Sequence, residues 1–202
     1  MATSTTMLDG TYRLHKGDQD FTPMGKLACF AQRSVVPEVS CIPCPDDVPL
    51  EIAAMIGCCV TTGVGAATIT AGVVPGSSVA VVGCGGVGLN VIQGAKLSGA
   101  SKIIAVDISE GALEFAMGFG ATHTVNPKQQ DGIQRVKEIT DGLGADYTFE
   151  VFGSKETVEL AFDMARKGGT ATIVGISPDD QIPEINRSTL VRQEKTLKGS
   201  YY

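Results

Sequence analysis

The chain has few basic residues and no basic cluster. Its 16 lysines and arginines stand against 22 aspartates and glutamates, which gives a formal net charge of -6. A protein of this charge is repelled by the phosphates of nucleic acids and by anionic membrane surfaces. The composition therefore argues against a nucleic-acid partner or a membrane-surface partner.

Aromatic residues are also scarce, at 5% of the chain, whereas hydrophobic residues make up 43%. This composition is too apolar for a disordered chain and is usual for a globular α/β protein. A length of 202 residues accommodates one domain and a piece of another.

No secretory leader is recognisable in Met1-Ala2-Thr3-Ser4, which has neither a basic start nor an apolar run. A disulfide framework is typical of small secreted chains, so we expect reduced thiols in a cytoplasmic protein instead. The six cysteines concerned are Cys29, Cys41, Cys44, Cys58, Cys59 and Cys84.

Charged side chains are absent between Glu51 and Lys96, a stretch longer than the roughly 20 residues that a membrane-spanning helix needs. Pro75, many glycines and Ser77-Ser78 interrupt it, however, and its apolar residues fall into short clusters. Buried strands of a parallel sheet have this appearance as well. We favour the core of an α/β protein over a membrane segment.

From residue 78 onward, short β-branched runs alternate with segments of helical periodicity. Strands are predicted at 79–82, 102–106, 123–125, 147–151, 171–174 and 196–201, and helices at 86–97, 110–119, 131–139 and 155–166. Such alternation predicts a doubly wound six-stranded parallel sheet, the Rossmann arrangement, with the strand order that binds dinucleotides across a switch point.

The first part of the chain has too few predicted elements for a closed core. A strand is expected at 27–36, a turn at 43–47, and helices from 49 or 50 to 56 and from 61 to 71. We interpret residues 1–60 as an appendage whose partner surface lies elsewhere and residues 61–202 as a nucleotide-binding domain. Both ends of the chain are expected to be cut.

The run Gly83-Cys84-Gly85-Gly86-Val87-Gly88 has the G-x-G-x-x-G pattern between a predicted strand and a predicted helix. Gly83 allows a tight turn, Gly85 lets the backbone approach a pyrophosphate, and Gly88 lets the helix pack close to the sheet. The amides of Gly86, Val87 and Gly88 then face the phosphates at the helix start. The alternative is that these glycines serve only turns and packing.

Asp107 follows the next predicted strand, where a carboxylate can accept hydrogen bonds from the adenosine ribose. Its charge would repel a 2′-phosphate, so the sequence predicts NAD(H) as the coenzyme over NADP(H). The alternative role is only to cap the helix that follows.

Several segments resemble the zinc-containing medium-chain alcohol dehydrogenases, and the similarity extends from about residue 8 to the C-terminus. The segments that carry it are 57–67, Pro75-Gly76, 79–88, 120–123, 149–153 and Val174-Gly175-Ile176. The resemblance implies an N-terminal catalytic domain of GroES-like fold, of which residues 1–60 would be the remnant.

The same resemblance assigns residue roles. It implies that Cys58 is a ligand of catalytic zinc, that Thr62 lies against the nicotinamide, and that Val151, Val174 and Ile176 line the coenzyme path. A thiolate suits Zn²⁺, but a catalytic site needs three protein ligands. From the residues alone, a single cysteine on an apolar helix is more often a core residue than a ligand.

The other catalytic ligands, the proton relay and the structural zinc lobe of the family would all precede the aligned region. No catalytic residue is therefore named within this chain, and the C-x-x-C spacing of Cys41 and Cys44 is taken as coincidental. Zinc is expected in the complete parent protein only.

The leading hypothesis is the NAD-binding portion of a zinc-dependent alcohol dehydrogenase that transfers hydride between an alcohol or aldehyde and the nicotinamide. Two alternatives stay open: a truncated, non-catalytic nucleotide-binding module, and a zinc-free medium-chain reductase. By resemblance we also expect a homo-oligomer formed through Leu190 to Tyr202, the last predicted strand region.

Overall fold

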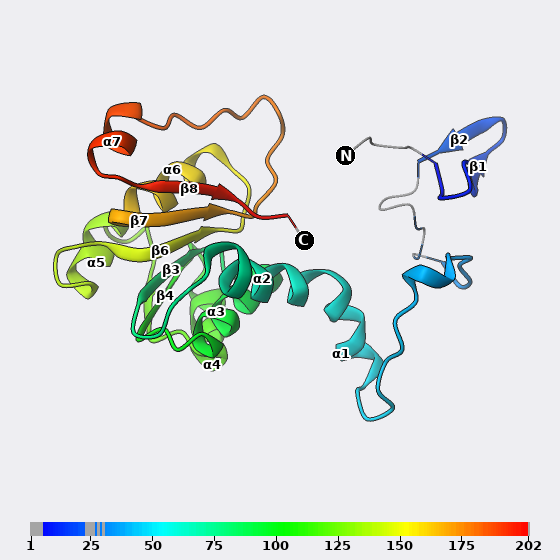
Figure 1. Cartoon of the computed structure of the whole chain (residues 1–202), viewed down its shortest axis with the longest axis horizontal. Helices are drawn as coiled ribbons and strands as arrows, with labels where there is room; N and C mark the ends of the chain where they lie inside the picture. The colour runs from blue at the N-terminus through cyan, green and yellow to red at the C-terminus, as the bar shows by residue number, and fades with distance from the viewer. Residues whose placement is uncertain (1–5, 23–26, 28, 30, 202) are drawn as a thin grey trace. The chain divides into compact units, whose positions relative to one another are not determined.

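The computed structural model describes residues 6–22, 27, 29 and 31–201. The chain forms two compact units that divide after Pro49 (Figure 1). The boundary expected at residue 60 falls inside a helix of the second unit. The assignment of residues 1–60 to a catalytic-domain remnant and of 61–202 to a nucleotide-binding domain stays a prediction.

The first unit contains a two-stranded antiparallel hairpin, which was not expected. Its strands are β1 (Leu14–Lys16) and β2 (Gln19–Phe21), and a short 3-10 helix, η2 (Glu38–Ser40), follows later. Gly17 makes the turn with a φ of +61°, which glycine adopts without strain. The strand expected at 27–36 is wrong over residues 31–36, which are not in a strand; residues 28 and 30 lie outside the described part.

The second unit contains a six-stranded, fully parallel sheet with the order β5-β4-β3-β6-β7-β8. This confirms the doubly wound Rossmann arrangement and its predicted order (Figure 1). The strands are β3 (Ser78–Val82), β4 (Lys102–Val106), β5 (His123–Val125), β6 (Ala145–Glu150), β7 (Ala165–Ile173) and β8 (Thr196–Gly199).

Helices cover both faces of this sheet. They are α3 (Gly86–Leu97), α4 (Glu110–Phe119), α5 (Gly132–Ile139) and α6 (Lys155–Met164). A further helix, α7 (Arg187–Arg192), has no buried residue. Because side chains alternate along a strand, Val79 and Val81 pack with α3 and α4, whereas Ala80 and Val82 pack with α5 and α6. The two buried cores explain why the strands read as continuous apolar runs.

One continuous helix runs from Leu50 to Ala71, where two helices had been expected. It consists of α1 (Leu50–Met55), the π-helical segment η3 (Ile56–Val60), α2 (Thr61–Gly65) and the π-helical segment η4 (Ala66–Ala71). Gly72 ends it in the left-handed conformation. Length and apolar composition alone would let this helix cross a membrane, which is weak evidence because core helices share these properties.

Two further expectations need correction. The helix expected at 155–166 ends at Met164 instead, and the chain continues directly into β7, where the pairing with β6 is irregular. Helix α7 was missed, although Asn186 is an N-cap whose side chain accepts hydrogen bonds from the amides of Ser188 and Thr189.

Candidate functional site

The carboxyl end of β3 is the switch point of the sheet. The chain returns from β3 to β4 on one side and, later, β6 pairs with β3 on the other side. Loops that leave the two halves of such a sheet diverge, and ligands of open α/β proteins bind in the crevice between them. The glycine-rich run 83–88 leaves β3 at this point.

Three glycines of this loop have distinct steric settings. Gly83 has a φ of +98°, a conformation that favours glycine, and its amide donates to the carbonyl of Val106 over 2.8 Å. A Cβ on Gly88 would lie 1.9 Å from the carbonyl oxygen of Gly83, so no other residue fits there. A Cβ on Gly85 would meet nothing within 4 Å, which leaves its surface open to a ligand.

Helix α3 begins directly after Gly85, which is its N-cap and provides no side-chain hydrogen bond. The first amides of any helix have no partner within the helix, and here they belong to Gly86, Val87 and Gly88. The partial positive charge of the helix start adds to their attraction for an anion. The loop therefore meets the steric and electrostatic requirements of a pyrophosphate cradle.

Asp107 follows β4 and joins two loops of this edge. Its Oδ2 accepts a hydrogen bond from the amide of Cys84 over 2.8 Å, and its Oδ1 accepts one from the amide of Ser109 over 2.9 Å. Each carboxylate oxygen can accept more than one hydrogen bond, so both bonds leave acceptor capacity for a sugar hydroxyl. Asp107 thus fixes the glycine loop and presents a negative charge beside it.

The thiol of Cys84 is buried beneath the same loop. Burial, and secondarily the negative charge of Asp107, raise the pKa of this thiol to about 12. The side chain is therefore a neutral thiol at physiological pH and serves packing rather than nucleophilic chemistry.

The loops after β6 and β7 close the other side of the crevice. Val151 lies within 3.3 Å of the Cβ position of Gly83, and its amide donates to the carbonyl of Val82. The amide of Val174 donates to the carbonyl of Glu150 over 2.8 Å. Ile176 is exposed, and its carbonyl lies close to Gly153. The structure thus places Val151 against the glycine loop, and Val174 and Ile176 beside Glu150 and Gly153 at the neighbouring loop.

Glu150, at the end of β6, is a residue that the sequence analysis missed. It is fully buried, and its Oε1 accepts three hydrogen bonds. The donors are the amides of Phe152 and Gly153 and the hydroxyl of Thr157, at 2.9, 2.6 and 2.7 Å. Its Oε2 has no partner among the described residues. A charged residue within a strand predicted to be buried was the available signal.

Thr62 lies in α2, which packs closely on the start of α3. A Cβ on the adjacent Gly63 would lie 2.5 Å from the carbonyl of Val87, so the two helices are in direct backbone contact. Thr62 is 8% exposed, and its hydroxyl has no partner among the described residues. The structure therefore brings Thr62 next to the glycine helix with a hydrogen-bonding group to spare.

Cys58 is exposed in η3. Within the described part of the chain, no group of three or more His, Cys, Asp or Glu side chains could hold a metal ion. Cys41 and Cys44 are exposed, free thiols. These residues do not form a zinc site by themselves, and the ligand role of Cys58 stays a prediction.

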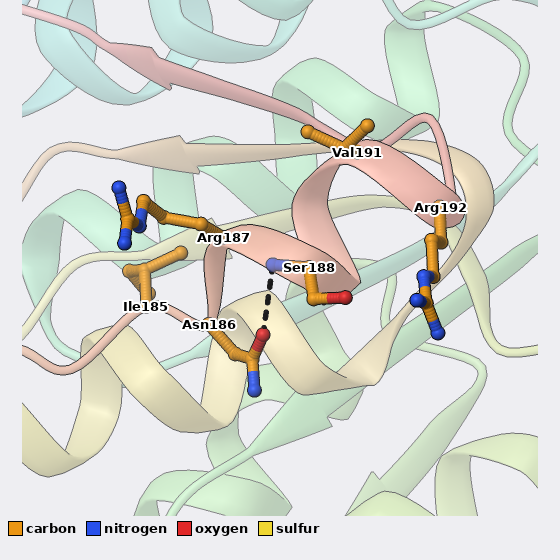
Figure 2. A pocket seen from close by; sticks show the side chains of 6 residues that line it. All are labelled: Ile185, Asn186, Arg187, Ser188, Val191 and Arg192. Carbon is orange, nitrogen blue, oxygen red and sulfur yellow. Dashed lines mark hydrogen bonds between the residues drawn. The ribbon is translucent and has the colours of Figure 1, made fainter.

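A depression of about 650 Å³ lies elsewhere, on the surface of α7 (Figure 2). Only residues 185–188, Val191 and Arg192 line it, and the amide of Ser188 donates to Asn186 within it. It includes none of the residues at the glycine loop and is separate from the crevice.

The geometry defines a Rossmann-type nucleotide-binding domain, and comparison with known proteins agrees. A family model described as zinc-binding dehydrogenase matches residues 86–202. S-(hydroxymethyl)glutathione dehydrogenase of Saccharomyces cerevisiae is 45% identical over 179 residues, which is 85% of this chain and 46% of that protein. The chain belongs to the zinc-binding dehydrogenase family, and the resemblance inferred from the sequence is confirmed.

Solved structures show the same relationship. Benzyl alcohol dehydrogenase of Acinetobacter calcoaceticus has a TM-score of 0.79 and 37% identity, and the match covers 82% of this chain and 46% of that one. A putative zinc-binding dehydrogenase of Sinorhizobium meliloti, bound to NADP, has a TM-score of 0.64 and 31% identity, and the match covers 71% and 41%. The chain spans about half the length of the curated relatives it matches.

Proposed function

We propose that this chain is the NAD(H)-binding portion of a zinc-dependent alcohol dehydrogenase. The observation that carries the proposal is the glycine loop. The amides at the start of α3 have no partner within the helix, and Asp107 holds the loop through the amide of Cys84. Bound there, the nicotinamide would supply the hydride chemistry between an alcohol and its aldehyde. The substrate class rests on the names of the relatives alone.

The chain's own residues would bind and orient the coenzyme. The amides of Gly86, Val87 and Gly88 would hold the pyrophosphate, and Asp107 would accept hydrogen bonds from the adenosine ribose. Thr62 would lie against the nicotinamide with its unpartnered hydroxyl. The loops that carry Val151, Val174 and Ile176 would line the path between the two ends of the coenzyme.

The preference for NAD(H) over NADP(H) follows from charge. A 2′-phosphate would approach the carboxylate of Asp107, and no basic side chain forms an ion pair with that carboxylate in the described part of the chain. One structural relative is bound to NADP, so the family alone does not decide the preference. Asp107 is the residue on which our choice depends.

NADH fluorescence titration of the chain tests the proposal. We expect saturable binding, and Asp107→Asn should weaken it about tenfold or more because charged hydrogen bonds to the ribose are lost. The same variant should bind NADPH relatively better. Asp131→Asn is the matched control, because Asp131 is an exposed N-cap of α5 and Asn caps helices equally well. Unchanged NADH affinity in Asp107→Asn would refute the assignment.

A second candidate is a non-catalytic nucleotide-binding module. The observation in its favour is that Cys58 has no group of metal-ligating neighbours among the described residues. In the main proposal, Cys58 supplies one zinc ligand and the others lie outside the described residues. Metal analysis of the complete parent protein separates the hypotheses, since bound zinc that is lost in Cys58→Ser supports the ligand role. Absence of zinc would favour the non-catalytic module or a zinc-free reductase, and NADH titration separates these two because a decayed module need not bind the coenzyme.

Two further parts of the proposal concern assembly and location. Strand β8 is the edge strand of the sheet, and 41% of Leu197 is exposed there, so residues 190–202 offer an edge for pairing with a second copy. Tyr202 lies outside the described residues. Light scattering should report a dimer or larger oligomer, and a clean monomer would contradict it. All six cysteines are free, which agrees with the cytoplasmic location we propose.

A further inference from the structure

A second pocket lies at the opposite end of the strands, where β6, β7 and β8 begin. Its volume is about 470 Å³, which is within the range of about 300–1,000 Å³ found for small-molecule sites. Three lysines line it: Lys137 of α5, Lys167 of β7, and Lys195 just before β8. Asp163 is the one carboxylate among the lining residues.

The charges of these lysines are not balanced by partners. In the described part of the chain, none of the three forms a salt bridge, whereas Lys102 and Lys155 both do. Three lysines and one aspartate among the lining residues leave a local excess of positive charge, in a chain whose net charge is -6. A bound anion would lower the repulsion between Lys137 and Lys195, which act on each other.

Lys195 is the buried member of the group, with 8% of its surface exposed. Its Nζ donates to the carbonyl of Phe162 over 2.8 Å and lies 4.7 Å from the centre of the Phe162 ring. An ammonium has three donors, so others stay available. Burial foremost lowers the pKa of Lys195; the charge of Asp163 opposes this, and the charge of Lys137 lowers it further.

The remaining lining residues suit a polar ligand. Thr189 and Gln193 of the α7 region provide a hydroxyl and an amide, and Gly142 makes room beside them. Ile133 and Leu143 supply the apolar part of the wall. A ligand in this pocket would thus meet charged donors, neutral donors and a limited apolar surface, as small-molecule sites usually provide.

We propose that this pocket binds a small molecule through its phosphate monoester dianion, at a site separate from the coenzyme crevice. Three lysines can donate charge-assisted hydrogen bonds to one phosphate, and the volume exceeds what a bare phosphate needs. Binding would relieve the repulsion between Lys137 and Lys195 and pair the buried ammonium.

The test is a ¹H–¹⁵N NMR titration of the full chain with glycerol 3-phosphate, inorganic phosphate and glycerol, at constant ionic strength. We expect saturable shifts of the amides of Gly142, Leu143 and Gln193 with both phosphates and none with glycerol. Lys137→Gln and Lys167→Gln should each weaken binding about tenfold, the effect of losing one hydrogen bond between charged groups. They avoid the buried Lys195, whose replacement would disturb folding.

Lys128→Gln is the matched control, because Lys128 is exposed and does not line the pocket. It removes the same charge and should leave the affinity unchanged, as should Asp107→Asn in the coenzyme crevice. The proposal is overturned if no saturable shift occurs, if the shifts are confined to the glycine loop, or if Lys128→Gln weakens binding as much as Lys137→Gln. These outcomes are independent of whether the chain binds NADH.

Discussion

At the carboxyl ends of the strands, two carboxylates accept hydrogen bonds from the amides of glycine-containing loops, whereas at the strand starts a carboxylate forms an ion pair with an arginine. Asp107 and Glu150 accept hydrogen bonds from loop amides at the carboxyl ends of the strands. At the strand starts, Asp146 accepts hydrogen bonds from Ser78, and its Oδ1 accepts one from Nε of Arg166 over 2.6 Å.

This difference indicates where the fold tolerates substitution. At the carboxyl ends of the strands, a Cβ added at Gly88 would clash with main-chain atoms, which cannot rotate as a side chain can. A lost carboxylate acceptor would leave amides without partners. At the strand starts, Asp146 and Arg166 are partly exposed, so water replaces part of what a lost partner supplied. We therefore expect substitution of this pair to have a smaller effect than substitution at the carboxyl ends of the strands.

The largest effect is expected at Gly88. In Gly88→Ala, the new Cβ would lie 1.9 Å from the carbonyl oxygen of Gly83, so the loop must move. We expect a loss of about 3 kcal/mol in the free energy of unfolding, as for overpacking in a rigid site, and a fall in NADH affinity of about 100-fold or more. Denaturant unfolding and NADH titration measure both.

Gly86→Ala is the control for helix propensity. Its Cβ would come no closer than 3.7 Å, to Cys59, and both substitutions replace glycine near the start of α3. Its unfolding free energy should change by less than about 1 kcal/mol. Equal losses in the two variants would break the steric account of the loop.

Glu150 gives the next effect. Glu150→Ala removes the acceptor of three buried hydrogen bonds and should lower the free energy of unfolding by about 3 kcal/mol, since each unpaired donor costs roughly 1–3 kcal/mol. Glu150→Gln keeps one oxygen acceptor and should cost less than half as much in the same denaturant experiment. If the two variants lose equal stability, the hydrogen bonds to Oε1 are not what holds these loops.

A third pair of variants tests the packing of α2 on α3. Gly63→Ala should cost about 2 kcal/mol, because its Cβ would lie 2.5 Å from the carbonyl of Val87. Gly65→Ala, on the same helix, would meet nothing within 4 Å and should stabilise the protein by up to about 1 kcal/mol. Thermal unfolding separates these opposite signs, and destabilisation by Gly65→Ala would contradict the packing described.

The smallest effect is expected at Asp146, at the start of β6. Burial raises the pKa of Asp146, but hydrogen bonds from Ser78 and the charge and hydrogen bond of Arg166 outweigh it, so the pKa lies below the ordinary value of 3.8. A carboxylate with a lowered pKa stabilises the folded state fully above about pH 4, and this stability is lost as the pH falls through the folded value.

Asp146→Asn should therefore cost about 1 kcal/mol at pH 7 and flatten the decline of the unfolding free energy below pH 4. Urea unfolding at several pH values measures this. An unchanged acid slope in the variant would show that other carboxylates cause the decline.

The sequence predicted the second unit well because its signals are local. Helices α3 and α4 and strands β4 and β5 have the bounds expected from periodicity, and Ser109 and Gly120 cap α4. Parallel pairing followed from the alternation, since each helix must return the chain to the same edge. The glycine loop and Asp107 could be predicted for the same reason, as each follows a strand directly.

Other features depended on contacts between distant segments. Gly168-Gly169 resembles a helix end but lies in an irregular part of β7, where Gly169 approaches the backbone of Ala145. Residues 31–36 are not in a strand, and the one sheet in the described part of that unit consists of β1 and β2. The network of Glu150 involves Thr157 on the next helix, and single-strand patterns carry no information on such bonds.

The most direct measurement is a map of the amide shifts that NADH causes in ¹⁵N-labelled protein. We predict the largest shifts at residues 84–88, whose amides form the proposed pyrophosphate cradle, and at Ser109, whose amide donates to the carboxylate of Asp107. Two results would contradict the central claim that this glycine loop is the coenzyme site: NADH saturates the protein without shifting the amides of residues 84–88, or NADH does not bind at all.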